Sequence, residues 1–351
     1  MDNFLQLNNI SVGYNTEKPI VKELSFTLQE GELACLLGPS GCGKTTVLRA
    51  ISGFQEISSG YISLHNTRLS DTSTLVSPER RNIGMVFQDH ALFPHLSIAE
   101  NVAFGLSNLD KPAREERVLS LLKLVGLIDH RAHYPHELSG GQSQRAALAR
   151  AMAPRPKLLL MDEPFSNLDA DLRETLGYEV RTLLKEFGMT AIMVTHDQDD
   201  AFALADKIGV MSQGELVQWD SSYRLYHAPN SRFVANFVGD GVFVPGKFID
   251  DNTVLTSFGP ISGGTVAMHG NNKEIDLLIR PDDVKINDDS ATRGKITRKA
   301  FKGAQTLYTV KMKSGETLIS LVPSHDNYEV GDVVGVLIDA DHLVCFSREM
   351  N

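Results

Sequence analysis

The chain has 351 residues, 42% hydrophobic and 22% charged, which is ordinary usage for a globular protein of two domains. Its formal net charge of −10 argues against a nucleic-acid partner, because so acidic a chain presents no broad basic field to phosphates. Its three cysteines have no metal-like or disulfide-like spacing, which fits a reducing cytosol. We see no signal peptide and no apolar run of the about 20 residues that are needed to cross a bilayer.

Residues 4–28 alternate apolar and polar side chains, as in Phe4–Leu7 and Leu24–Leu28. Such alternation predicts antiparallel strands, which we expect at one edge of the first domain. The following run, Glu32–Leu37, is short and almost wholly apolar, which is typical of a buried strand.

Residues 38–45 read Gly-Pro-Ser-Gly-Cys-Gly-Lys-Thr and fit the pattern G-x-x-x-x-G-K-[ST] without exception. The glycines let backbone N–H groups turn inward around a phosphate, Lys44 adds a charge at the β/γ oxygens, and the Thr45 hydroxyl can hold Mg²⁺. A helix is expected from Thr46 to Ile51, with its N-terminus facing the anion. The residues predicted to contact ATP here are Gly38, Pro39, Ser40, Gly41, Cys42, Gly43, Lys44, Thr45 and Thr46.

Cys42 lies inside this loop, close to the start of the expected helix and to Lys44. Both the helix dipole and the lysine charge favour a thiolate. We therefore expect Cys42 to be reactive toward a maleimide.

The segment 90–137 is predicted to be mostly helical, with Pro94 and Pro112 as breaks. Leu138–Gln142 reads Leu-Ser-Gly-Gly-Gln and precedes a strong helix former, Ser143–Met152. Ser139, Gly140, Gly141 and Gln142 therefore stand at a helix N-terminus, where N–H groups and the dipole can receive an anion. They suggest that one ATP is bound from two sides.

Two carboxylates follow a strand of four apolar residues in Leu158–Pro164. Open α/β sheets bind their ligands at the carboxyl ends of strands, so Asp162 is placed to hold Mg²⁺ and Glu163 to polarise the attacking water. Another buried strand, Ala191–Val194, is followed by His196, which can reach the γ-phosphate from the same edge. Beyond it we expect a short helix, a last strand and a closing helix, over residues 199–204, 208–211 and 233–237.

After Gly239, short β-rich runs alternate with turn residues and point to a small β-barrel. The expected strands are Val242–Val244, Ile275–Ile279, Thr306–Val310, Thr317–Leu321 and Val333–Ile338. Such barrels often bind oligonucleotides, but that needs a basic and aromatic face, and this segment is rich in Asp. A dimer-stabilising or regulatory role is the favoured alternative.

These motifs, in this order, resemble those of the ATPase subunits of ABC transporters, and the resemblance covers essentially the whole chain. It implies an α/β P-loop ATPase domain over residues 1–238, with a helical subdomain at about 90–155, and an OB-like regulatory domain over 239–351. Within the resemblance, Tyr14 is the residue that stacks on adenine, and residues 138–142 are the signature. Asp162 and Glu163 are the Walker B pair, and Ser166–Asp169 is the D-loop. Gln88 is a catalytic and metal-binding glutamine, and His196 is the switch histidine. Asn167 and Ser143 depart from the commoner family residues, and neither change removes a catalytic group.

The resemblance further implies that two chains pair head to tail, with each ATP and its Mg²⁺ between the phosphate loop of one chain and the signature of the other. Glu163, His196 and Gln88 then form the catalytic set, and Thr45, Gln88 and Asp162 the metal set. Expected partners are membrane permease subunits and, indirectly, a periplasmic solute-binding protein, with the chain on the cytoplasmic face of the inner membrane.

Whole-chain similarity looks nearest to ferric-ion importers, including the run Arg49–Phe54, and sulfate, polyamine and sugar importers remain alternatives. A non-transport ABC ATPase is a further one. It is disfavoured because the chain carries one ATPase cassette and no sustained heptads between Thr45 and Leu138.

Overall fold

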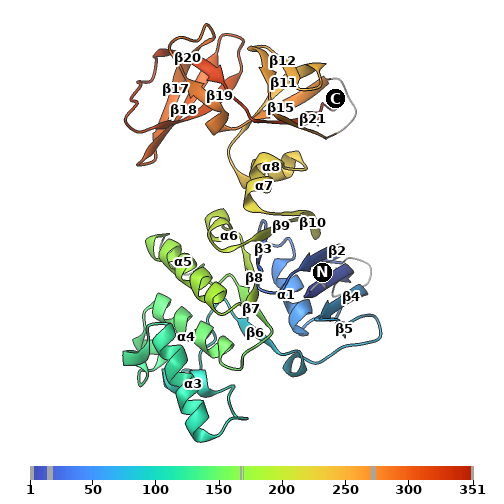
Figure 1. Ribbon diagram of the computed structural model, residues 1–351, viewed down its shortest axis with the longest axis vertical. Helices are drawn as coiled ribbons and strands as arrows, with labels where there is room; N and C mark the ends of the chain where they lie inside the picture. The colour runs from blue at the N-terminus through green and yellow to red at the C-terminus, as the bar shows by residue number, and fades with distance from the viewer. Residues whose placement is uncertain (1–3, 14–18, 167, 169, 270–273, 349–351) are drawn as a thin grey trace. The chain divides into compact units, whose positions relative to one another are not determined.

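The computed structural model describes residues 4–13, 19–166, 168, 170–269 and 274–348. The chain forms two compact units, Met1–Ser222 and Tyr223–Asn351, which Figure 1 colours from blue to yellow and from yellow to red. Among the described residues, no helix is long and apolar enough to cross a membrane. All three cysteines are free and buried.

A largely parallel sheet forms the centre of the first unit, with strands in the order β10-β9-β3-β8-β7-β6. The strands from β9 to β6 are parallel, and β10 pairs with β9 antiparallel. Every residue of β3, β7 and β8 is buried, as expected of parallel strands that are covered on both faces. The bounds are β3 (Leu33–Leu37), β6 (Ile83–Val86), β7 (Leu158–Asp162), β8 (Thr190–Thr195), β9 (Lys207–Ser212) and β10 (Glu215–Asp220).

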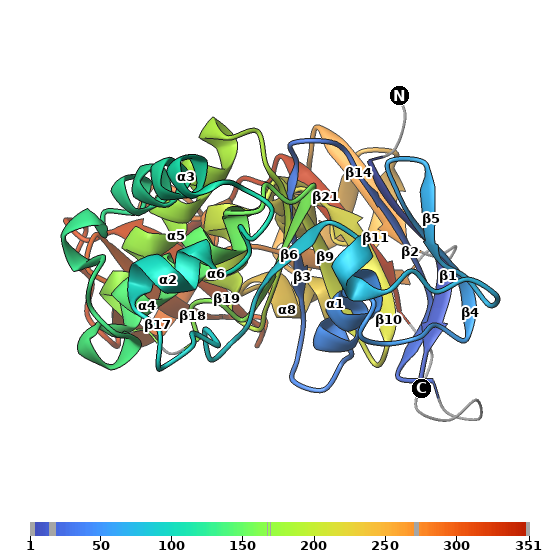
Figure 2. The ribbon, with the colours of Figure 1, turned by 90° about the horizontal axis from the view of Figure 1, so that it is seen from below.

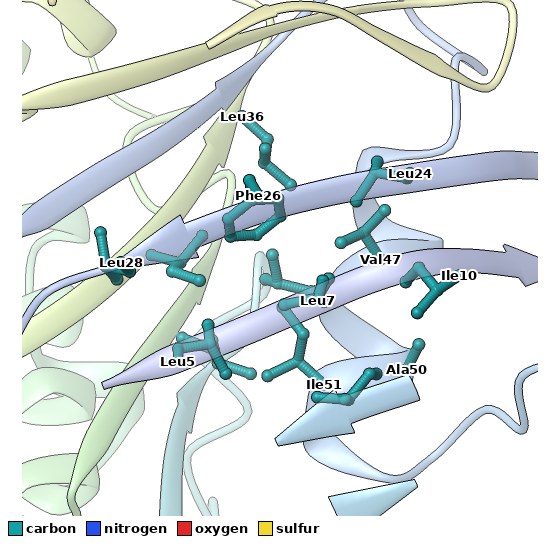
Figure 3. Close-up of a cluster of buried hydrophobic side chains, with 14 of the residues drawn as sticks. Leu5, Leu7, Ile10, Leu24, Phe26, Leu28, Leu36, Val47, Ala50 and Ile51 are labelled. Carbon is teal, nitrogen blue, oxygen red and sulfur yellow. The ribbon is translucent and has the colours of Figure 1, made fainter. Parts of the chain in front are cut away.

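An antiparallel sheet packs beside it, with strands in the order β2-β1-β4-β5. Alternate side chains of β1 and β2 point inward and meet α1, as Figure 3 shows for Leu7, Phe26, Val47 and Ile51. The strands expected within residues 4–28 are thereby confirmed in β1 and β2, each with one largely buried face. The bounds are β1 (Leu5–Val12), β2 (Val21–Leu28), β4 (Ser59–Leu64) and β5 (Thr67–Ser70).

The helices of the first unit follow their capping signals. Ser97 and Glu100 form a capping box at α2, and Asp110 caps α3 with Pro112 in its first turn. Figure 2 shows α2, α3 and α4 together, and both Figures 1 and 2 show α3 and α4 apart from α1. The bounds are α1 (Lys44–Ser52), α2 (Ile98–Ala103), α3 (Lys111–Leu124), α4 (Gly140–Met152), α5 (Ala170–Glu186), α6 (Gln198–Leu204) and the 3₁₀ helices Pro78–Arg80, Ile128–His130 and Pro135–Glu137.

The second unit contains two sheets, with strand orders β13-β12-β11-β15-β21-β14 and β16-β20-β17-β18-β19. Both contribute to one apolar core, which includes Val244 and Ile275 from the first sheet and Tyr308 and Leu318 from the second. The expected OB-like β character is confirmed, and each predicted run lies in a strand. The bounds are β11 (Val242–Asp250), β12 (Thr253–Thr256), β13 (Gly259–Ser262), β14 (Thr265–His269), β15 (Glu274–Ile279), β16 (Val284–Ile286), β17 (Arg293–Phe301), β18 (Gln305–Met312), β19 (Thr317–Pro323), β20 (Val333–Ile338) and β21 (His342–Ser347), with the 3₁₀ helix Pro281–Asp283.

The division between the units falls at Ser222/Tyr223 rather than at the expected 238/239. Helices α7 (Ser222–His227) and α8 (Arg232–Val238) belong mainly to the second unit. Arg280 explains this, because its buried guanidinium donates to the carbonyls of Tyr226, Ala235, Gly239 and Asp240 at 2.8–3.3 Å. A cation that satisfies helix-terminal carbonyls fixes both helices to the β unit.

Candidate functional site

The loop of residues 38–43 joins β3 to α1 in a conformation that requires glycine. Gly41 and Gly43 have φ of 80° and 106°, in the left-handed region. At Gly38 the limit is space, because a Cβ would lie 2.4 Å from the Met211 carbonyl oxygen. The glycines of the motif therefore serve one narrow turn at the carboxyl end of β3.

Lys44 is buried in this turn, with an exposed fraction of 5%. Its ammonium donates to the carbonyl oxygens of Gly38 at 2.7 Å and Pro39 at 3.1 Å. The loop backbone thus wraps around the lysine Nζ, which is held at the mouth of the turn.

The pairing of the central strands brings four strand ends to one edge of the sheet. Leu37 of β3 lies opposite Thr195 of β8, and Asp162 of β7 opposite Val194. Val86 of β6 lies opposite Met161. Because the strands are parallel, the segments that follow them leave at the same edge.

Thr45 and Asp162 meet at this edge although 117 positions separate them, and the Thr45 hydroxyl donates to Asp162 Oδ1 at 3.0 Å. Burial raises the pKa of the Asp162 carboxyl, and the neighbouring Glu163 charge adds to that, while the Thr45 hydrogen bond, Arg49 and Lys44 lower it. A cation placed here would offset the cost of keeping Asp162 ionised.

Glu163 and His196 form the next pair, with Glu163 Oε2 at 3.3 Å from His196 Nδ1. Glu163 adopts a φ of 43°, which is unusual outside glycine, and its N–H donates to the Val194 carbonyl at 2.9 Å. This backbone strain turns the carboxylate out of the strand and toward the histidine.

Gln88 lies two residues beyond β6 and is exposed. Its strand neighbours β7, so its segment leaves the sheet at the edge where Asp162 lies. Tyr14 lies outside the described residues, as do Asn167 and Asp169 of the expected D-loop.

The segment Ser139–Gln142 begins α4, as predicted. Ser139 and Gln142 form a capping box, and Gln142 Nε2 also lies 3.3 Å from His130 Nε2. Ser139 and Gly140 are exposed, and α4 lies apart from α1 in Figures 1 and 2. The structure therefore does not join this segment to the phosphate loop of the same chain.

The expectation that the helix dipole and Lys44 favour the Cys42 thiolate is wrong. Cys42 is 5% exposed, and burial raises the pKa of its thiol more than Lys44 lowers it. Desolvation disfavours the charged form, and here it outweighs one nearby cation.

Sequence reasoning missed a charged network next to His196. Thr195 donates its hydroxyl to buried Asp200 at 3.1 Å, and Arg173 Nη1 lies 2.5 Å from Asp197 Oδ2. An acidic N-cap followed by two more acids in the first turn of α6 was the available signal, but Arg173 stands on a different helix, α5.

Comparison with known proteins places this geometry in a family. A family model described as ABC transporter matches residues 21–166, and one described as TOBE domain matches residues 277–346. The Fe(3+) ions import ATP-binding protein FbpC 2 of Haemophilus influenzae is 37% identical, over 95% of this chain and 95% of its own length. The chain belongs to the ABC transporter family.

The names of further relatives of this ABC ATPase include spermidine/putrescine as well as Fe(3+) ions. The spermidine/putrescine import ATP-binding protein PotA of Clostridium novyi is 39% identical over 96% of both chains, and the Vibrio cholerae FbpC is 38% identical over 93% of both. A solved dimeric structure of the ATP-binding cassette MJ0796, in a post-hydrolysis state bound to ADP and Pi, matches with a TM-score of 0.55 at 31% identity. It covers 62% of this chain and 98% of the cassette.

Proposed function

We propose that this ABC ATPase hydrolyses ATP to drive the import of a solute across the cytoplasmic membrane, with ferric iron as the first candidate. The observation that carries the proposal is the meeting of four strand ends at one sheet edge. The segments that leave these neighbouring strands carry the phosphate loop, the Asp162–Glu163 pair, His196 and Gln88.

In this proposal, the residues from Gly38 to Thr46 bind the phosphates of ATP. The turn supplies inward backbone N–H groups and the N-terminus of α1, both of which favour an anion. Lys44 leaves the carbonyl oxygens of Gly38 and Pro39 for the β/γ oxygens. Tyr14 is expected to stack on adenine.

The residues at the edge fit Mg²⁺. The Thr45 hydroxyl oxygen and Asp162 Oδ1 lie 3.0 Å apart, and Gln88 adds an amide oxygen. Oxygen is the ligand atom that this ion takes beside substrate phosphates. When bound, the ion would neutralise charge that develops on the phosphates.

Glu163 is the proposed general base, because its carboxylate faces His196 at the end of the same sheet. It would orient and polarise the water that attacks the γ-phosphate, and His196 would hold both the carboxylate and the γ-phosphate oxygens. Such catalysis works mainly by positioning and charge stabilisation.

A homodimer completes the proposed site. The exposed start of α4 lies apart from α1, so Ser139, Gly140, Gly141 and Gln142 would bind the ATP held by the partner chain. The dimeric, nucleotide-bound cassette among the solved relatives supports this arrangement. ATP binding would then close the dimer, and phosphate release would open it.

The expected partners are permease subunits that contact the helices α2 to α4 and the Gln88 segment, and a periplasmic protein that delivers the solute. The chain would then work at the cytoplasmic face of the inner membrane. Names of relatives support ferric ions and, as a second candidate, spermidine or putrescine, at 37–39% identity in each case.

Glu163→Gln tests the catalytic assignment. We expect it to keep ATP binding and to lower turnover by at least a hundredfold, because the charge that polarises water is lost while the shape is kept. Sedimentation with MgATP should show a dimer that persists in the variant and dissociates in the parent. A variant that turns over ATP at the parental rate would remove Glu163 from this role.

Uptake by a strain that lacks this chain tests the solute. Radioactive ferric citrate and radioactive spermidine are offered separately, with the strain complemented by the parent or by Glu163→Gln. Ferric uptake that only the parent restores supports the first candidate. Restoration of spermidine uptake alone selects the second.

A further inference from the structure

An arginine on α5 connects the two loops that leave β7 and β8. Arg173 Nη1 pairs with Asp197 at 2.5 Å, and its Nη2 donates to the Leu168 carbonyl at 3.4 Å. Leu168 lies in the loop after Glu163, and Asp197 directly follows His196. One guanidinium therefore holds the chain just beyond both members of the Glu163–His196 pair.

A second connection runs through Asp200, which is 7% exposed. It accepts the Thr195 hydroxyl at 3.1 Å, and its Oδ1 lies 4.0 Å from Arg173 Nε. The Thr195 hydroxyl in turn accepts the Asp197 N–H at 3.0 Å. His196, whose side chain is 51% exposed, is thus flanked along the chain by two residues that both take part in this network.

We propose that Arg173 is a positioning residue that, with Asp200, fixes the His196 segment relative to Glu163. The residue itself touches neither, and its action passes through Asp197, Asp200 and the Leu168 carbonyl. This inference rests on the proposed function for its kinetic consequence, but the placement of His196 can be measured without turnover.

The pair of bonds explains why arginine stands here. A planar guanidinium reaches Asp197 and the Leu168 carbonyl with one group and still approaches Asp200, whereas a lysine ammonium is a compact point charge. Two loops that are each tied to the same rigid group cannot shift independently. A displacement of about 1 Å between reacting groups lowers rates by roughly a hundredfold.

The same helix offers a matched control. Arg181 also lies on α5 and pairs with an aspartate, Asp206, at 2.8 Å, with side-chain exposure of 32% against 24% for Arg173. Asp206 borders the amino end of β3, where its carboxylate accepts the Leu33 N–H. Arg181→Ala removes an ion pair of the same kind at the opposite edge of the sheet.

The experiment compares Arg173→Ala, Arg173→Lys and Arg181→Ala in the full chain. Steady-state ATPase assays separate kcat from KM, and ¹³C-histidine NMR follows the His196 signal, assigned with His196→Ala. We expect Arg173→Ala to lower kcat about tenfold or more with KM within about twofold, and to move the His196 signal. Arg173→Lys should have a kcat between those of the parent and Arg173→Ala, and Arg181→Ala should leave kcat and the His196 signal unchanged.

Three outcomes overturn the inference. These are an unmoved His196 signal in Arg173→Ala, a kcat within twofold of the parent, or an equal kcat loss in Arg181→Ala. If Arg173→Ala does not fold, Arg173→Lys decides by the same criteria. A parent without ATPase activity would defeat the proposed function, while the His196 signal would still decide the positioning inference.

Discussion

At the scale of single residues, burial can outweigh a nearby charge in setting the pKa of a side chain. Asp200 shows this, because its carboxyl is 7% exposed although it stands beside Arg173. Burial and the Asp197 charge raise its pKa to about 6, while the Thr195 hydrogen bond, Arg173 and His196 lower it. Here the cost of desolvation exceeds the attraction of the nearby cation.

This raised pKa predicts a pH-dependent stability. A carboxyl with a higher pKa in the folded state binds a proton there first, so its stabilising effect is complete below the ordinary value of 3.8 and is lost as pH rises through about 6. Asp200→Asn keeps the shape and removes the titration. We expect the variant to gain roughly 1.4 kcal/mol over the parent between pH 5 and pH 7.5, which is about half of the effect of the whole shift from 3.8 to about 6.

Urea unfolding of both proteins across that range measures the effect. Asp220→Asn is a suitable control, because Asp220 is a half-buried aspartate on the edge strand β10 and not on α6, where Asp200 lies. A stability difference between Asp200→Asn and the parent that stays constant with pH would contradict the prediction.

At the scale of elements, the position of α1 depends on groups at both of its ends. Its first turn carries Lys44 and Thr45, and its last carbonyls are bound by Arg81, which is 2% exposed. Arg81 donates to the carbonyls of Ala50 at 3.0 Å and Ile51 at 2.8 Å, and its described hydrogen-bond acceptors include no carboxylate. Burial lowers its pKa to about 10, so it remains a cation at the negative end of the helix.

Arg81→Ala should therefore destabilise the first unit by about 3 kcal/mol, since several buried carbonyls lose their donor. It should also weaken nucleotide binding, because the first turn of α1 would be less firmly held. Thermal unfolding and titration with a fluorescent ATP analogue measure both effects. Its neighbour Arg80 is exposed, so Arg80→Ala should change stability by less than about 0.5 kcal/mol. Equal effects of the two substitutions would reject this account of α1.

At the scale of the whole molecule, the two units have separate apolar cores. The core of the first unit contains residues of β1, β2, α1 and the central sheet, and the core of the second contains strands from β11 onward. Tyr308 is the largest fully buried side chain of the second core, and its hydroxyl accepts the Tyr328 N–H at 3.1 Å. Each unit therefore has the apolar interior that a separate cooperative transition requires.

Tyr308→Ala should lower the unfolding temperature of the second unit by several degrees, because it leaves a large cavity that costs about 3–5 kcal/mol. The first unit should still bind MgATP with unchanged affinity. Calorimetry with and without MgATP separates the two, since the ligand stabilises only the unit that binds it. Loss of nucleotide affinity in this variant would show that the units do not behave separately.

The elements that sequence alone predicted are those specified by local rules. The phosphate loop follows from its glycines, the start of α4 from the strong helix former that follows Ser139–Gln142, and the strands of the central sheet from their continuous apolar runs. Each of these depends on φ/ψ preference, capping or burial on both faces, and these properties act over a few residues.

Only the tertiary structure decided which distant residues meet and which groups are out of water. Thr45 reaches Asp162 across 117 positions because β3 and β7 both neighbour β8, an order that no local motif encodes. The packing of α5 beside α6 likewise places Arg173 against Asp197. Burial of Cys42 reversed the expected shift of its pKa. The hydrogen bonds from Arg280 to α7 and α8 explain why these two helices group with the second unit. Desolvation and long-range hydrogen bonds depend on the whole packed molecule, so the sequence pattern around a residue does not reveal them.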